Sequence, residues 1–253
     1  MDESEIEKPS FLKKVQSAVF TIAAIMLSIG QWSDTKEMSV EFYEGFIAKF
    51  TDQIELDRLK SVKVGGNLEF IEQTFGIATL IKHSTQKADL EYRYYPDSKY
   101  ILTIAAQDNV IKGYQVISLD SSFSPNLPFT DKSLGNFSYT DFAPYYDEIR
   151  SDSANLVYYL EGQPLGRVGL FFNQFVTYVG YGAAYAEADV SKQQIIALNE
   201  SLLQKGQEGS VEVLTSLRSQ IKPNTFAVGD IDATTAADML ITRYEYAAYF
   251  KDE

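Results

Sequence analysis

The chain has 253 residues, 45% of them hydrophobic, which is enough to form a sizeable core in one large domain or two small ones. Its formal net charge of −13 argues against nucleic acid as a partner, because phosphate binding requires a basic face. The absence of cysteine excludes disulfides, thiolate metal sites and a cysteine nucleophile. The single histidine, His83, excludes metal sites that need two histidines. We therefore expect no cofactor and no bound metal.

The first feature along the chain is an uncharged segment of 19 residues, Val15–Ser33, which follows two lysines. A helix of about this length crosses ~30 Å of hydrocarbon, and Trp32 stands where an interfacial aromatic is common. We expect a disordered acidic tail at residues 1–10 and a transmembrane anchor at residues 11–33. The lysines predict a single-pass inner-membrane protein with a periplasmic main domain, and the anchor makes the membrane a partner.

Other interpretations of this segment stay open. Small residues at its end also fit a cleaved secretory signal. Its serines, threonine and glutamine fit a buried core helix. A helix in the membrane plane is a further alternative, although these polar residues carry no charge and form no strong polar face. A main domain in the cytosol is a further alternative to the periplasmic orientation.

Helical periodicity predicts a juxtamembrane helix within residues 34–59. The first α/β unit is expected at residues 60–122, with a short helix between Asn67 as N-cap and Gly76 just past its end. Strands are predicted near 90–95, 99–106 and 110–119, separated by turn residues.

A second α/β unit, residues 130–185, resembles a copy of the first. The Gly66-Asn67 pair reappears as Gly135-Asn136. We expect strands at 155–160 and 168–173 to match the first unit's predicted strands at 90–95 and 101–106, with a turn at 162–166 between them. A period that nearly holds through three landmarks indicates a duplication.

The last part, residues 186–253, is expected to be helical, with helices at 189–205, 211–221 and 235–250. Thr235 and Asp238 have the spacing of a capping box at the start of the last helix. The predicted fold class is therefore α+β: an N-terminal transmembrane helix, two similar helix-plus-antiparallel-sheet units and a helical C-terminal part.

The chain is rich in tyrosine and phenylalanine, with 17 and 16 residues, and many stand in short alternating runs typical of strands. One interpretation is that they fill a core beneath helices. The other is that one sheet face presents them to a partner protein, since aromatic residues are common interface anchors. The residues predicted to bind a partner in this way are Tyr92, Tyr94, Tyr95, Tyr158, Tyr159, Phe172 and Tyr178.

Residues 58–119 carry a further pattern: a glycine before a short helix that ends at Phe75-Gly76, then a hairpin-rich stretch. This is similar to the small α/β domain of the outer-membrane assembly lipoprotein family, and β-lactamase inhibitor proteins carry two such units in tandem. The run Tyr158–Pro164 also resembles an uncharacterised family of bacterial membrane-anchored proteins. Ile77 stands where the lipoproteins have proline, and no cysteine exists to carry a lipid. The resemblance implies a fold that binds other proteins and supplies no catalytic residue.

The sequence therefore predicts a membrane-anchored, non-enzymatic protein-interaction module with an unknown protein partner. One alternative is an effector or immunity protein with a cytosolic sensing domain. Another is a hydrolase with paired carboxylates, for which Asp141 and Glu148 are candidates. Asp230 and Asp232 resemble a metal-binding pair, although acids are also favoured just before a helix.

Overall fold

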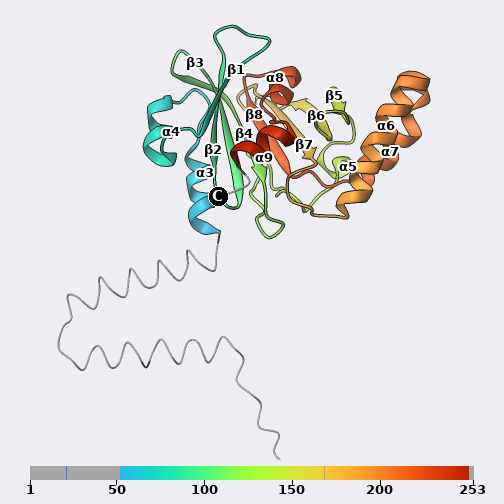
Figure 1. Ribbon diagram of the computed structural model, residues 1–253, viewed down its shortest axis with the longest axis horizontal. Coiled ribbons are helices and arrows are strands. Elements are labelled where there is room, and N and C mark those ends of the chain that lie inside the picture. Colours follow the sequence, from blue (N-terminus) through green and yellow to red (C-terminus); the bar gives the residue numbers. More distant parts are fainter. Residues whose placement is uncertain (1–20, 22–51, 168, 251–253) are drawn as a thin grey trace, which may run out of the picture. The chain divides into compact units, whose positions relative to one another are not determined.

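The computed structural model describes Thr21, residues 52–167 and residues 169–250 (Figure 1). The chain forms two compact units, Met1–Asp57 and Arg58–Glu253. Helix α3 (Gln53–Ser61) crosses the boundary between them, at the end of the region where the juxtamembrane helix is predicted. All the strands of the described residues belong to the second unit.

The structure corrects the prediction of a transmembrane helix. Among the residues that the structure describes, no helix combines the length and the apolar character that a membrane crossing requires. The predicted tail at 1–10 lies outside the described residues, as does the predicted anchor at 11–33 apart from Thr21. The fold class with an N-terminal span is therefore wrong, and so are the single-pass, inner-membrane and periplasmic assignments that depended on it.

An eight-stranded antiparallel sheet forms the centre of the second unit, in the order β1-β2-β3-β4-β8-β7-β6-β5. Its strands are β1 (Leu80–His83), β2 (Glu91–Pro96), β3 (Tyr100–Gln107), β4 (Val110–Ser118), β5 (Glu148–Asp152), β6 (Tyr158–Pro164), β7 (Asn173–Val179) and β8 (Thr225–Gly229). The remaining helices are α4 (Leu68–Phe75), α5 (Tyr139–Phe142), α6 (Ala188–Gly209), α7 (Val211–Gln220), α8 (Ala233–Asp238) and α9 (Arg243–Tyr249). The described part of the chain is thus an α+β fold, as predicted.

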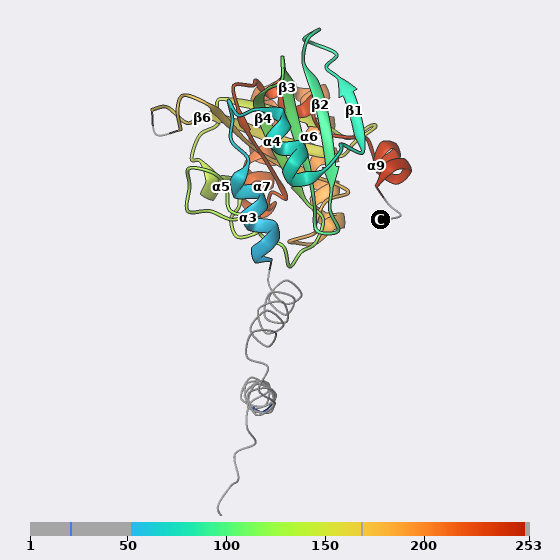
Figure 2. The ribbon, with the colours of Figure 1, turned by 90° about the vertical axis from the view of Figure 1, so that its left-hand side faces the viewer.

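Both faces of the sheet are covered, and side-chain alternation divides the strand residues between them. On one face, Tyr92 and Tyr94 pack into a core with residues of α8 and of the segments around α9, including Met239 and Phe250. On the other, Tyr95 contacts Phe75 of α4, with 6.1 Å between the ring centroids. Figures 1 and 2 show the helices on either side of the strands.

The first half of the sheet follows its local sequence signals closely. The Asn67 side chain accepts a hydrogen bond from the Glu69 amide at the start of α4, and Gly76 ends the helix at φ 83°. This left-handed conformation favours glycine. Strands β2, β3 and β4 lie within one residue of the predicted ranges. Both faces of β3 are buried, which explains its nearly continuous apolar run.

The two halves of the sheet share a strand order. In each half a short helix precedes four strands, and the last strands, β4 and β8, pair at the centre. The predicted register of the second unit is wrong: Gly162 lies inside β6, and β7 begins only at Asn173. The predicted turn was therefore placed too early. That the two units are similar in three dimensions stays a prediction, which superposing residues 60–119 on 130–182 would test.

The C-terminal part is not purely helical. Strand β8 lies within it and joins the two halves of the sheet. The predicted helix at 235–250 is two helices, α8 capped by Asp232 and α9 capped by Thr242. The capping box belongs to Thr242 and Glu245 rather than to Thr235 and Asp238.

Candidate functional site

Most of the aromatic residues predicted to bind a partner are buried. Tyr92, Tyr94, Tyr95, Tyr159 and Tyr178 belong to the buried core, while Tyr158 and Phe172 are half-buried. Because helices or loops cover both faces of the sheet, five of these seven side chains cannot reach a partner in the folded protein. Their predicted binding role is corrected to a packing role.

Two of these tyrosines fix loops from inside the core. The Tyr92 hydroxyl lies 3.0 Å from Asp238 Oδ2 and 2.9 Å from Ser84 Oγ, which connects the β1–β2 loop to α8. The Tyr159 hydroxyl donates a hydrogen bond to Glu161. Burial raises the pKa of both hydroxyls, so both stay protonated at neutral pH.

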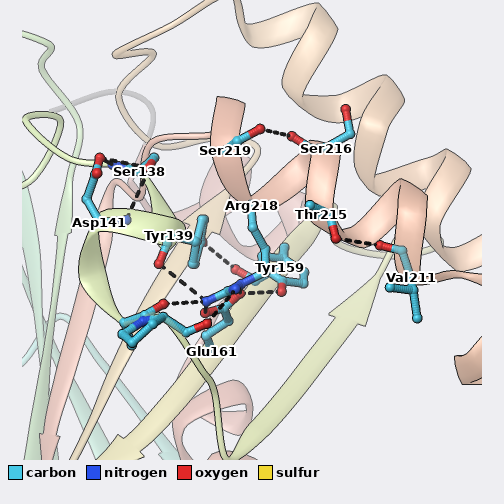
Figure 3. A network of polar contacts seen from close by, with 12 residues as sticks. Ser138, Tyr139, Asp141, Tyr159, Glu161, Val211, Thr215, Ser216, Arg218 and Ser219 are labelled. Atoms are coloured by element: carbon cyan, nitrogen blue, oxygen red, sulfur yellow. Dashed lines mark hydrogen bonds and ion pairs between the residues drawn. The ribbon is translucent and has the colours of Figure 1, made fainter.

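Glu161 and Arg218 form a buried ion pair between β6 and α7 (Figure 3). Arg218 Nε lies 2.6 Å from one carboxylate oxygen of Glu161, and Nη2 lies 3.2 Å from the other. The Arg218 side chain is 11% exposed and the Glu161 side chain is 1% exposed. Arg218 Nη2 also donates to the carbonyl of Ala143 at 2.7 Å, and its guanidinium lies 5.2 Å from the Tyr146 ring centroid.

The surroundings of this pair indicate a structural role. Burial raises the pKa of Glu161, although hydrogen bonds from Arg218 and Tyr159 oppose the shift. Burial alone would lower the pKa of Arg218, but the hydrogen bond and charge of Glu161 raise it overall. Both carboxylate oxygens accept hydrogen bonds from this chain. The pair therefore joins α7 to β6 and to the segment after α5.

The carboxylates considered from the sequence serve other contacts. Asp141 completes the capping box of α5 with Ser138, and Glu148 pairs with Arg150. Asp232 caps α8 and lies 3.2 Å from Lys87 Nζ. Within the described part of the chain, no group of three or more His, Asp or Glu residues could hold a metal ion. The structure thus accounts for Asp141, Glu148 and Asp232, three of the four acids considered, by helix capping or a surface ion pair.

The loop between β6 and β7 presents a pair of exposed apolar residues. Leu170 and Phe171 are 65% and 75% exposed. They occupy the centre of a tight turn, in which the Phe172 amide donates to the Gly169 carbonyl at 3.0 Å. The loop is also closed by the hydrogen bond from the Phe171 amide to the Gly166 carbonyl at 2.7 Å. In Figure 2 the loop after β6 projects from the sheet. We call residues Leu170 and Phe171 the hairpin tip.

The backbone of the hairpin tip is strained for its residue types. Leu170 and Phe171 have φ values of 57° and 61°, and two consecutive positive φ values define a type I′ turn. Such turns favour Asn-Gly or Asp-Gly, because a side chain with a Cβ costs about 1 kcal/mol or more in the left-handed region. The β3–β4 turn has the same pattern at Asp108 and Asn109, with φ values of 51° and 63°. There the residue types suit the turn.

This contrast makes the hairpin tip the candidate functional site. Two large apolar residues occupy an unfavourable backbone conformation and remain in solvent, so neither local geometry nor core packing explains them. Strain of this kind concentrates at functional positions. The sequence pattern predicts a strand at 168–173, which places no exposed turn at Leu170 and Phe171. The available signal was Gly166 and Gly169 flanking the loop.

Comparisons with known proteins gave no relationship: no protein-family model, no curated protein and no solved structure matches this chain. A function must therefore be argued from the site itself.

Proposed function

We propose that this protein is a non-enzymatic interaction module that binds a partner protein through the hairpin tip. The observation that supports the proposal is the placement of Leu170 and Phe171, exposed and at positive φ, in a turn that favours Asn-Gly. Burial of an exposed leucine or phenylalanine stabilises a complex by about 1.5–3 kcal/mol for each side chain. A partner would thus recover more free energy than the strained turn loses.

The geometry of the turn supports a binding role in a second way. Hydrogen bonds from the Phe171 and Phe172 amides to the Gly166 and Gly169 carbonyls hold the backbone at Leu170 and Phe171 in the turn before any partner binds. Preorganisation of this kind reduces the entropy that binding would otherwise remove. The resemblance of the sequence to tandem-unit inhibitor proteins, whose fold binds other proteins, agrees with this proposal.

The sharpest test replaces the hairpin tip with the residues that the turn prefers. In the double variant Leu170→Asn/Phe171→Gly we expect the melting temperature to rise by a few degrees, because the strain is relieved. We expect co-purification of the partner from native extracts to be lost. A control variant, Leu203→Asn, removes an apolar side chain that is 88% exposed on α6 and should leave co-purification unchanged.

Two results would count against the proposal. If the double variant retains its partner, the hairpin tip is not the binding site. If it loses the partner together with several degrees of stability, Leu170 and Phe171 stabilise the fold.

A further inference from the structure

A second exposed aromatic lies at the same end of the sheet as the hairpin tip. Tyr145, between α5 and β5, is 85% exposed. Two residues later, the Asp147 amide donates to the Gly162 carbonyl at 3.2 Å, and Glu148 pairs with Gly162 in the sheet. Gly162 stands two residues before β6 enters the hairpin. The segment of Tyr145 therefore runs beside the base of the hairpin.

The two features are close enough for one interface. Gly162 pairs with Phe175 of β7, and the four residues from Phe175 back to Phe171 extend at most about 14 Å at the rise of a strand. A typical interface covers roughly 800 Å² on each partner, about 30 Å across. A single partner could contact both Tyr145 and Phe171.

Tyr145 is held in place rather than carried on a free loop. Arg218 donates to the carbonyls of Ala143 and Pro144, at 2.7 and 3.4 Å, and lies over the ring of the neighbouring Tyr146. Glu161 fixes Arg218 in turn. The buried ion pair thus acts as a positioning element for the segment that exposes Tyr145.

The charges around the two aromatics differ in sign. Asp141, Asp147 and Glu148 are exposed around Tyr145, and of these three acids Glu148 is paired with Arg150, at 3.1 Å. Hydrogen bonds from Ser138 lower the pKa of Asp141, so this carboxylate stays ionised at neutral pH. In the described residues of the hairpin loop, 165–167 and 169–172, the charged side chain is that of Arg167, which is exposed.

We infer that Tyr145 and the hairpin tip form one binding surface for a folded protein with an apolar pocket and a basic rim. The pocket receives Phe171, because a projecting side chain requires a concave partner. The basic rim lies against Tyr145 and its neighbouring acids, since complementary charges set register and association rate. This inference rests on the proposed function and adds the extent of the site and the chemistry of the partner.

Site-specific photocrosslinking of the full chain tests the extent of the surface. A photoreactive phenylalanine is placed at position 171 or at position 145 in the cells that make the protein. Control positions are Leu203 on α6 and Tyr249 on α9, which are also exposed. We expect positions 171 and 145 to crosslink the same protein, identified by mass spectrometry, and the control positions not to crosslink it.

Binding kinetics with that purified protein test its charge. The variant Asp147→Asn/Glu148→Gln should lower the association rate about 3- to 10-fold and weaken its salt dependence, with little change in dissociation. A matched control, Glu208→Gln/Glu212→Gln on α6 and α7, removes the same charge elsewhere and should have a smaller effect. Phe171→Ala should instead raise the dissociation rate, by tenfold or more.

The outcomes separate this inference from the proposed function. Failure of position 171 to crosslink any protein overturns both. Crosslinks from position 171 but not from position 145, or to different proteins, overturn the shared surface and leave the interaction module intact. An association rate that is insensitive to Asp147 and Glu148 overturns the basic rim alone.

Discussion

The two halves of the sheet share a strand order but differ in where they place charge and strain. In the half formed by β1–β4, Arg93 pairs with Glu91 at 2.7 Å near the surface, and the β3–β4 turn uses Asp-Asn. The half formed by β5–β8 contains a buried ion pair instead, and its β6–β7 turn uses Leu-Phe. The first half is built from locally favourable choices. The second departs from them at two places: the hairpin tip, which belongs to the proposed binding surface, and the buried ion pair, which holds the segment next to Tyr145.

The largest expected effect comes from breaking the buried ion pair. Arg218→Met leaves the Glu161 carboxylate buried without its partner, which typically costs about 3–5 kcal/mol. Arg93→Met in the first half should cost less than about 1 kcal/mol, because its ion pairs are partly solvated. Urea unfolding measures both.

The double variant Glu161→Leu/Arg218→Met distinguishes an unpaired charge from lost packing. With no charge left to desolvate, it should recover most of the stability that Arg218→Met loses. A double variant as unstable as the single one would show that the loss comes from packing and hydrogen bonds to the Ala143 segment. Equal losses for Arg218→Met and Arg93→Met would remove the contrast between the halves.

Core tyrosines should give the next largest effect. Tyr94 is fully buried in β2, and its ring centroid lies 6.4 Å from that of Phe250. Tyr94→Ala should therefore cost about 3 kcal/mol. Tyr158 in β6 is half-buried, so Tyr158→Ala should cost about half as much. Equal losses in thermal unfolding would contradict the burial that the structure assigns to the two positions.

The difference between the halves also explains what the sequence could predict. In the first half, Asn67, Gly76 and the alternating residues of β2 are local signals, and they located α4 and three strands correctly. The α+β character followed from the same signals. Strand β8 gave no such signal, because both its faces are buried and its run of apolar residues has no alternation. It was therefore absorbed into a helical region.

The candidate site was less predictable than the fold. The aromatic residues were recognised as important, but composition does not show whether a strand has one covered face or two. Tyr92 and Tyr159 became core residues because α8 packs over one face and α5 and α7 over the other. The hairpin tip depends on a register set by pairing with β8, a contact distant in sequence. When the pairing of β7 with β8 is not known, the sequence pattern predicts a strand at residues 168–173.

A smaller effect concerns pH. Burial raises the pKa of Glu161, and loss of Arg218 should raise it further. In the unfolded chain a glutamate titrates near ~4.3. Since the folded state then binds the proton more tightly, the stability lost in Arg218→Met should be partly regained as pH falls from 7.5 to 5.5. One pKa unit corresponds to about 1.4 kcal/mol. The Glu161→Leu/Arg218→Met variant has no such carboxyl, so a similar recovery in it would assign the effect to other groups.

The most direct test of the comparison between the turns moves the Leu-Phe sequence to the other turn. The variant Asp108→Leu/Asn109→Phe gives the β3–β4 turn the residues of the hairpin tip and leaves the tip itself unchanged. It should lower stability by about 1–2 kcal/mol, because two side chains enter the left-handed region without the polar groups that tolerate it. Thermal unfolding measures this loss, and partner binding should not change.

If strain alone defined the tip, Leu-Phe at either turn would behave alike. Recognition belongs to the β6–β7 position if two results are found together. The partner binds the Asp108→Leu/Asn109→Phe variant as tightly as the native chain, and Leu170→Asn/Phe171→Gly abolishes binding. Tighter binding to the Asp108→Leu/Asn109→Phe variant would instead show that the partner recognises any Leu-Phe turn, and the special role of the second half would fail.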